Sequence, residues 1–214
     1  MKQLYPEHWK VALRCDAFVI TRRLAVVLGM TVCVGLISCD LFKTRTPAGP
    51  SKESSTRIPP TEPSLVLQNM VSAFHDGNSE NYIASFSDAS FDFEATSNAN
   101  KNFSDTFDSW NKSLEQKYFL KIMSELGKNS SVDLIFDSYT PTYYPGSDSS
   151  QIQTTYHLTV PLNSGTAKKF RGQALFILRV DQSNYWYYIS RWQDIDYYGT
   201  TDSTWSDLKG SFAQ

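Results

Sequence analysis

Cysteine, long apolar runs and positive charge are all scarce in this 214-residue sequence. No cysteine follows Cys39, so residues 40–214 can form neither a disulfide nor a thiolate metal site. The longest apolar run, residues 24–37, has 14 positions, whereas a helix needs about 20 apolar residues to cross a bilayer. Residues 64–214 contain 11 Lys and Arg against 17 Asp and Glu, a formal charge of −6. Nucleic-acid binding requires a basic face, and none is visible in the sequence; the negative charge also disfavours attraction to anionic lipids.

The apolar run ends in Leu36-Ile37-Ser38-Cys39 and follows Arg22-Arg23. Its length is typical of the apolar core of a signal peptide. The ending resembles the lipobox of bacterial lipoprotein precursors. The resemblance implies that residues 1–38 are a signal peptide and that Cys39 becomes the first residue of the mature protein. It also implies that the Cys39 sulfur carries a diacylglycerol with palmitate-type chains.

Two alternatives compete with the lipobox. A membrane helix could end at Cys39, but the polar residues that follow it argue against a buried thiol there. The pair Arg22-Arg23 could instead belong to a twin-arginine export signal, although adjacent arginines are common ahead of signal-peptide cores. We expect a protein of the bacterial cell envelope, anchored to a membrane by lipid, with the outer membrane favoured over the inner. The folded part is expected outside the cytoplasm.

The composition changes sharply after Cys39. Five of the nine prolines lie between residues 40 and 63, among Ser, Thr, Lys and Glu. A stretch of this kind cannot bury apolar area, so residues 39–63 are predicted to be a lipidated cysteine and a disordered tether. Residues 64–214 contain 26 aromatic residues and are predicted to form one domain. A docking motif for a proline-reading partner is the alternative for the tether.

The spacing of apolar residues predicts helices first and strands afterwards. Leu67, Met70, Val71 and Phe74 recur at helical spacing, and the residues after Gly127 alternate as strands do. The predicted helices cover 64–76, a short segment from 79, and 108–126. The predicted strands lie near 91–93, 132–136, 151–162, 170–181 and 184–196.

This order of elements over residues 64–196 resembles the NTF2-like cone, the architecture of nuclear transport factor 2, ketosteroid isomerase and scytalone dehydratase. The segments 186–194 and 205–210 are also similar to envelope lipoproteins of unassigned role. The resemblance implies an α+β fold in which N-terminal helices pack in a strongly curved antiparallel sheet around a pocket. A lipocalin-type barrel is the alternative, and it requires more strands than this sequence predicts.

Enzymes with this fold use an Asp, His or Tyr inside the cone as base or electrophile. Three strand carboxylates, Asp133, Asp137 and Asp194, are therefore candidates for a general base, because burial among aromatic rings would raise the pKa. His75 and His157 are better explained as structural residues, the first at a helix end and the second on a polar strand face. The aromatic residues expected to line the pocket are Trp110, Tyr156, Phe176, Tyr187 and Trp192.

No nucleophile–base pair, no metal-ligand spacing and no glycine-rich phosphate loop is found in the sequence. We therefore expect no metal and no cofactor, and a domain that binds rather than catalyses. Its expected partners are the membrane, through Cys39, and either an envelope protein or a small apolar ligand. The exposed tyrosines expected at Tyr143-Tyr144 and Tyr197-Tyr198 could contact a protein or a sugar. The alternative function is a lyase or isomerase that uses one of the strand aspartates as its base.

Overall fold

The computed structural model describes residues 57–199 and 202–213, and the structural statements below refer to these residues. The predicted signal peptide, Cys39 and the tether as far as residue 56 lie outside them. No helix among the described residues combines the length and apolarity that crossing a membrane requires. Residues of the predicted tether already contact the domain: the Arg57 side chain donates to the Ala84 carbonyl at 2.9 Å, and Ile58 exchanges two hydrogen bonds with the Asn69 side chain, at 2.8 and 2.7 Å.

Two helices open the domain. Helix α2 (Pro63–Asp76) starts at a proline, whose missing N–H is not needed in the first turn, and ends at Gly77 with φ of 65°. Helix α3 (Ser79–Ile83) begins where the Asn78 side chain accepts a hydrogen bond from the Asn81 N–H. Both helices agree with the predicted ranges.

The third predicted helix is shorter than expected. Helix α5 (Lys112–Ser124) begins at residue 112 and not at 108, because the Asn111 side chain accepts hydrogen bonds from the N–H groups of Ser113 and Leu114. Two helices were not predicted. These are α4 (Ser97–Asn102), which is capped by Thr96, and α6 (Trp205–Ala213) at the end of the described chain.

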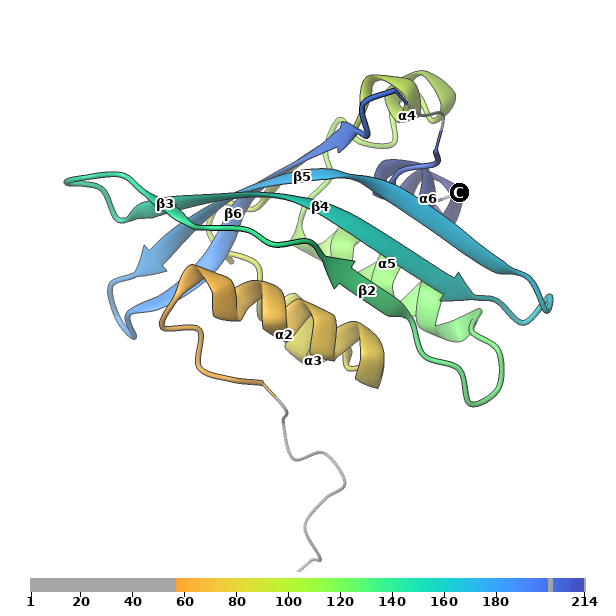
Figure 1. Cartoon of the computed structure of the whole chain (residues 1–214), viewed down its shortest axis with the longest axis horizontal. Coiled ribbons are helices and arrows are strands. Elements are labelled where there is room, and N and C mark those ends of the chain that lie inside the picture. Colours follow the sequence, from red (N-terminus) through yellow and green to blue (C-terminus); the bar gives the residue numbers. More distant parts are fainter. Residues whose placement is uncertain (1–56, 200–201, 214) are drawn as a thin grey trace, which may run out of the picture. The chain divides into compact units, whose positions relative to one another are not determined.

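The sheet has six strands, with β1, β6, β5, β4 and β2 side by side and β3 paired with β4. Three of them, β4 (Ser149–Pro161), β5 (Ala167–Asp181) and β6 (Trp186–Asp196), form a long antiparallel meander (Figure 1). The short strands are β1 (Asp92–Glu94), β2 (Asp133–Phe136) and β3 (Thr142–Tyr143). The expectation of an antiparallel sheet needs one correction, because β1 pairs with β6 in parallel.

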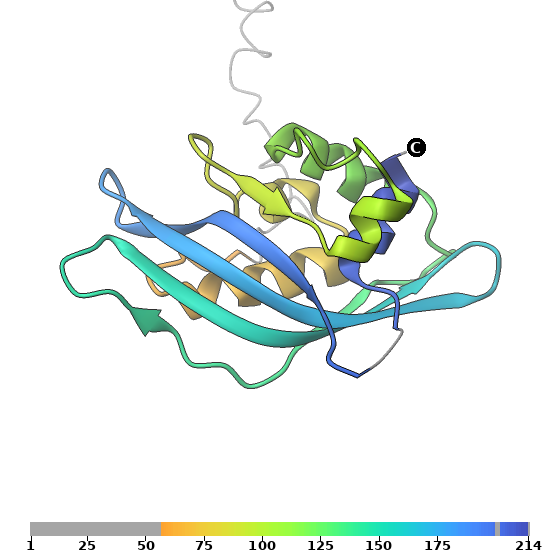
Figure 2. The same cartoon turned by 90° about the horizontal axis from the view of Figure 1, so that it is seen from above.

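The helices cover one face of this sheet, as Figure 2 shows. The alternating burial along β4 and β5 follows from this arrangement, since every second residue points toward the helices. The pairing of β5 with β6 shifts register between Ile177 and Leu178, an irregularity that bends and twists a strand pair. The result is a concave face on which the core is built.

Aromatic rings dominate that core. The Trp192 ring of β6 and the Trp205 ring of α6 lie edge to face, with centroids 4.5 Å apart and an interplanar angle of 85°. Each large ring buries about 150–250 Å² of surface, so a core of this kind can hold the domain together without a disulfide. The other large aromatic side chains that are fully buried are Tyr82, Tyr118, Tyr156, Phe74, Phe86, Phe119 and Phe176.

Candidate functional site

A cluster of charged and polar side chains lies inside the core, between the sheet and helices α5 and α6. Its centre is an ion pair in which the Lys209 Nζ is 2.6 Å from Glu115 Oε2. Both side chains are fully buried, with 0% of their surface exposed. A buried ion pair is stable only where further hydrogen bonds satisfy the remaining atoms, so the surroundings of each partner are decisive.

The Glu115 carboxylate has three hydrogen-bond donors. Besides Lys209, the Tyr82 hydroxyl donates to Oε1 at 2.5 Å, and the Trp110 indole N–H donates to Oε2 at 2.6 Å. The three donors come from α3, from the loop before α5 and from α6. Glu115 is therefore the point at which these three segments are joined in the interior.

The Lys209 ammonium group lies among aromatic rings. Its Nζ is 3.7 Å from the centroid of Phe93 and 3.8 Å from that of Trp192, and the rings of Trp110 and Tyr118 follow at 5.3 and 5.5 Å. Aromatic faces attract a cation, most strongly where water is excluded. Burial lowers the pKa of Lys209 to about 8, an effect that the nearby Glu115 charge opposes.

Asp194 on β6 is the second buried acid of the cluster. Its Oδ1 accepts a hydrogen bond from the Tyr156 hydroxyl at 2.7 Å. Its Oδ2 accepts two from Ser206, one from the backbone N–H at 2.7 Å and one from the hydroxyl at 2.6 Å. Burial raises the pKa of Asp194 to about 6, although the bonds from Ser206 and Tyr156 and the charge of Lys209 lower it.

Two buried tyrosines bond to helix α6, and one of them also bonds to Asp194. The Tyr156 hydroxyl accepts a hydrogen bond from the Trp205 backbone N–H at 2.7 Å while it donates to Asp194. The Tyr118 hydroxyl accepts one from the Trp205 indole N–H at 2.8 Å. Burial is the main cause that raises the pKa of both hydroxyls well above the usual value. Both tyrosines therefore remain neutral and help to hold α6 in place.

The predicted strand carboxylates separate into different environments. Asp194 points into the interior and is only 3% exposed. Asp133 is exposed on β2. Asp137 and His157 lie on the outside of the sheet, 51% and 42% exposed, with His157 Nε2 3.5 Å from Asp137 Oδ1. His75 is exposed at the end of α2, so both histidines lie outside the interior cluster.

The residues predicted to line a pocket are largely brought together. Trp110, Tyr156, Phe176 and Trp192 are buried and surround the interior cluster. Tyr187 is half-buried near the start of β6 and belongs to another part of the domain. Their role as the lining of a ligand pocket stays a prediction.

Sequence reasoning missed Glu115 and Lys209. Glu115 lies on the same helix face as the buried Tyr118 and Phe119, so its spacing predicts burial. Its charge alone favours an exposed position. Lys209 lies on α6, for which a signal exists at Thr204 and Asp207. The Asp207 carboxylate accepts a hydrogen bond from the Thr204 N–H at 2.7 Å, and the Thr204 hydroxyl oxygen accepts one from the Asp207 N–H at 3.4 Å, which is the reciprocal arrangement of a capping box.

Two hollows on the surface are candidates for ligand binding. The groove between α2 and β2, here termed the α2–β2 groove, has a volume of about 500 Å³. Its lining is mainly apolar and consists of Leu67, Gln68, Val71, Ser72, Leu134, Ile135, Phe136 and Tyr139.

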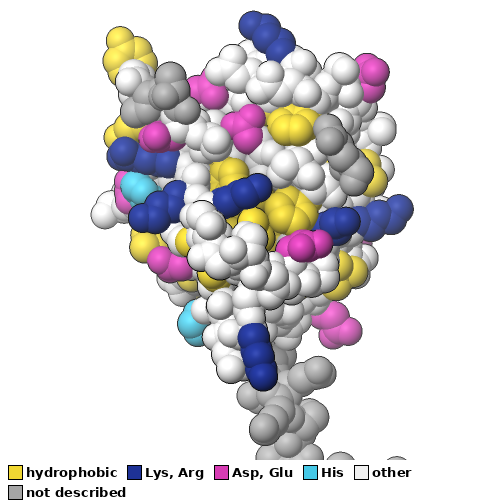
Figure 3. Space-filling model, turned by 90° about the vertical axis from the view of Figure 1, so that its right-hand side faces the viewer, with side chains coloured by type: hydrophobic (Ala, Val, Ile, Leu, Met, Phe, Trp, Pro, Cys, Tyr) yellow, Lys and Arg dark blue, Asp and Glu magenta, His cyan; other side chains and the backbone are white. Residues whose placement is uncertain are grey.

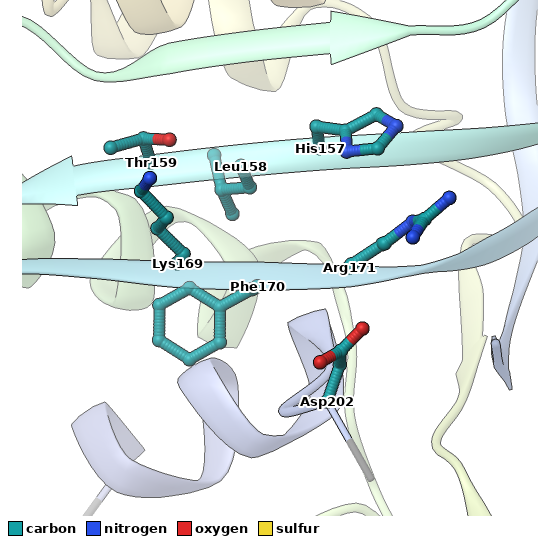
Figure 4. A pocket seen from close by; sticks show the side chains of 7 residues that line it. All are labelled: His157, Leu158, Thr159, Lys169, Phe170, Arg171 and Asp202. Carbon is teal, nitrogen blue, oxygen red and sulfur yellow. The ribbon is translucent and has the colours of Figure 1, made fainter. Parts of the chain in front are cut away.

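The other hollow lies outside the sheet on β4 and β5. It has a volume of about 320 Å³, and Figure 4 shows its polar lining residues His157, Lys169, Arg171 and Asp202. Basic and acidic side chains are mixed in it, as they also are on the face of the molecule in Figure 3. This mixture gives no preference for an anionic polymer.

No protein-family model and no curated protein matches this sequence. Solved structures do. A candidate aromatic ring hydroxylase from Novosphingobium aromaticivorans is 11% identical with a TM-score of 0.51, over 67% of this chain and 91% of that one. A candidate scytalone dehydratase from the same organism is 9% identical with a TM-score of 0.49, over 66% and 89%. An NTF2-like superfamily protein from Salmonella enterica is 10% identical with a TM-score of 0.48, over 64% and 89%.

At such identities the likeness concerns the fold alone, since one fold hosts many unrelated functions. The chain has helices on one face of a bent, mostly antiparallel sheet, in the order that the sequence predicted apart from the added elements α4, β3 and α6. Together with the match at a TM-score of 0.51, this arrangement confirms the predicted fold class. The domain has the α+β NTF2-like fold.

Proposed function

We propose that this chain is a lipid-anchored lipoprotein of a bacterial cell envelope and that its NTF2-like domain is a non-catalytic binding module. The lipobox-like ending at Cys39 supports the anchor. The state of Asp194 supports the absence of catalysis, and it is the observation on which this proposal mainly depends. The binding partner is an envelope protein or a small apolar ligand.

A general base must come within about 2.6–3.2 Å of the heavy atom whose proton it removes. Asp194 is 3% exposed, and both of its oxygens already accept hydrogen bonds from Tyr156 and Ser206. Glu115 and Lys209 are likewise buried and bonded to each other. These contacts close the interior around the acids, which favours a function at the surface over a lyase or isomerase reaction inside the cone.

The α2–β2 groove is the surface feature that fits a small apolar ligand best. Its volume of about 500 Å³ falls within the range of roughly 300–1,000 Å³ typical of ligand sites. Leu67, Val71 and Phe136 supply apolar lining. At its edge Ile135 is 51% exposed, on a strand that ends the sheet. The site lies outside the interior cluster, so a ligand can enter without breaking the Glu115–Lys209 pair.

Photolabelling tests this assignment. The full-length protein, reconstituted in vesicles, is exposed to a diazirine-bearing fatty alcohol, and the labelled peptides are mapped by mass spectrometry. Labelling is expected to concentrate on α2 and β2. Val71→Glu places a charge in the groove and is expected to reduce labelling there about tenfold, since burying an unpaired charge is costly.

Leu120→Glu is the matched control, because Leu120 is also apolar, is 50% exposed and lies on α5 outside the groove. It is expected to leave the labelling unchanged. Labelling spread evenly over the domain, or reduced equally by both substitutions, would show that the groove does not bind apolar ligands.

A further inference from the structure

Large exposed side chains gather where the β3–β4 and β5–β6 connections lie beside the start of the described chain. Tyr185 is 70% exposed, Tyr143 is 56% and Ile58 is 47%. An exposed patch of large apolar and aromatic side chains commonly marks a contact with another molecule or a membrane. The group, here termed the aromatic end, consists of Ile58, Tyr143, Tyr144, Tyr185, Trp186 and Tyr187.

Strand pairing holds the two connections together. Tyr143 of β3 lies opposite Ser150 of β4, and Ser150 in turn lies opposite Leu178 of β5. The Val180 N–H donates to the Asp148 carbonyl at 2.9 Å, which joins the two connections directly. In both views of the ribbon these connections lie at the same end of the domain (Figures 1 and 2).

The chain also reaches the domain at this end. The Tyr187 N–H donates to the Pro60 carbonyl at 2.8 Å. The Arg57 guanidinium carbon lies 5.3 Å from the centroid of the Trp186 ring. Only 17 residues separate Arg57 from Cys39, and a chain of that length spans at most about 60 Å. A lipid on Cys39 would therefore tether the domain from this end and leave the aromatic end within reach of the bilayer.

The chemistry of the aromatic end fits the interface of a bilayer and not an anionic surface. Tyrosine and tryptophan favour the headgroup level of a membrane, because each has an apolar ring and a polar atom that stays hydrated. The charges nearby are mixed, with exposed Asp148 and Asp181 beside Arg179. Electrostatic attraction to anionic lipids is thus not what would hold this end on a membrane.

We propose that the aromatic end rests on the headgroup region of the bilayer that holds Cys39. This inference rests on the proposed lipid anchor. In this orientation β6 runs away from the membrane, starting with Trp186 at the interface. Its 11 residues span about 35 Å at roughly 3.3 Å per residue, so Tyr198 beyond its far end lies well above the lipids.

Fluorescence quenching tests the orientation. The full chain carrying Tyr185→Cys or Tyr198→Cys is produced in its lipidated form, labelled with a fluorophore and reconstituted in phosphatidylcholine–phosphatidylethanolamine vesicles. A nitroxide-bearing phospholipid serves as the quencher. Both positions are exposed, Tyr198 at 95%, so both accept the label without disturbing the core. Quenching at position 185 is expected to be at least about threefold stronger than at 198, since contact quenching requires the label to reach the headgroups.

Removal of the rings distinguishes an attractive contact from simple proximity. In the Tyr185→Cys background, the added pair Tyr143→Ser and Trp186→Ser is expected to reduce the quenching by at least half, whereas Tyr198→Ser leaves it unchanged. Vesicles with added phosphatidylglycerol are expected to give no stronger quenching. Flotation of the protein with the vesicles reports on the anchor separately.

Protein that floats but is quenched equally at positions 185 and 198 would overturn the orientation while the anchor stands. Protein that does not float would overturn the anchor and the orientation together.

Discussion

At the scale of single residues, Asp194 shows how burial and hydrogen bonding act on one carboxyl group in opposite directions. The side chain is 3% exposed and accepts bonds from Tyr156 and Ser206, and its pKa is nevertheless raised to about 6. Loss of water around the charged form thus outweighs the stabilisation of the carboxylate by its donors. At neutral pH the charged Asp194 carboxylate therefore lowers the free energy of unfolding of the domain.

This raised pKa predicts a dependence of stability on pH. Between about pH 4 and pH 6 the folded protein keeps the Asp194 proton while the unfolded chain has lost it, because the folded pKa is about 6 and the usual value 3.8. The free energy of unfolding therefore falls as the pH rises through this window, by roughly 2 kcal/mol. The measurement is urea unfolding at a series of pH values, for the original chain and for Asp194→Asn.

The Asp194→Asn variant cannot titrate at this position. The difference in the free energy of unfolding between the variant and the original chain should therefore change between pH 4 and 6 by the amount given above. Parallel curves for the two proteins would mean that the folded and unfolded pKa values of Asp194 are equal. Asp133→Asn serves as the control, because Asp133 is exposed on β2, and its curve is expected to run parallel to that of the original chain.

At the scale of elements, helix α6 completes the core. Its first residue, Trp205, contacts Trp192 of the sheet and bonds to Tyr118 of α5. Gly210 lets the helix approach α4 closely, since an added Cβ would lie 2.4 Å from the Phe103 ring. Lys209 then inserts its charge beside Glu115 of α5. Helix α6 thus fills the concave side of the sheet from its open end.

The ion pair between α5 and α6 should therefore be strongly coupled. Lys209→Met leaves the Glu115 carboxylate buried without its cation, and Glu115→Gln leaves the ammonium group without its anion. Each change is expected to destabilise the domain by about 3–5 kcal/mol. The double variant should be destabilised by at least 1 kcal/mol less than the sum of the two single variants, because the effects of substituting residues in direct contact are commonly not additive. Urea unfolding followed by tryptophan fluorescence measures all three.

Arg191→Met provides the comparison with an exposed pair. Arg191 bonds to Glu94 at 2.6 Å, but the two side chains are 55% and 43% exposed, so its removal is expected to cost less than about 1 kcal/mol. A coupling near zero between Lys209 and Glu115 would show that the two charges do not stabilise each other in the folded domain.

At the scale of the whole molecule, the domain combines an aromatic core with a predicted lipid anchor. The formal charge of −6 over residues 64–214 disfavours attachment to anionic lipids by electrostatics. Stable attachment to a membrane would then depend on the proposed covalent lipid, with more than one acyl chain. The aromatic end would orient the domain but not replace the anchor.

Substitution of Cys39 tests the anchor. In cells fed an alkyne analogue of palmitate, the original chain is expected to incorporate the label and to lose residues 1–38. Cys39→Ala removes the sulfur that would be acylated, so the label should disappear and the precursor should keep its first 38 residues. Cys33→Ala, within the apolar run, should behave as the original chain does. Labelling that persists in Cys39→Ala would contradict the lipobox.

The helices and strands were largely predictable because their patterns are local. The spacing of Leu67, Met70 and Phe74 predicts α2, and the alternation around Tyr156 predicts β4, whatever the rest of the chain does. Asp194 was one of three equivalent candidates, since alternation shows that a residue lies in a strand but not whether its side of the sheet is covered. Only the packing of α6 distinguishes Asp194 from Asp133.

The amino-acid sequence alone determined the order of the elements, the acidic balance and the predicted lipobox, because each of these depends on residues that are neighbours along the chain. The tertiary structure alone decided that Glu115 and Lys209, 94 positions apart, form a buried pair and that α6 fills the cone. The same holds for the aromatic end, where the β3–β4 connection meets β5 and residues 57–60 contact the start of β6. Contacts between residues so far apart in the sequence form only when the core packs, and no local sequence pattern predicts them.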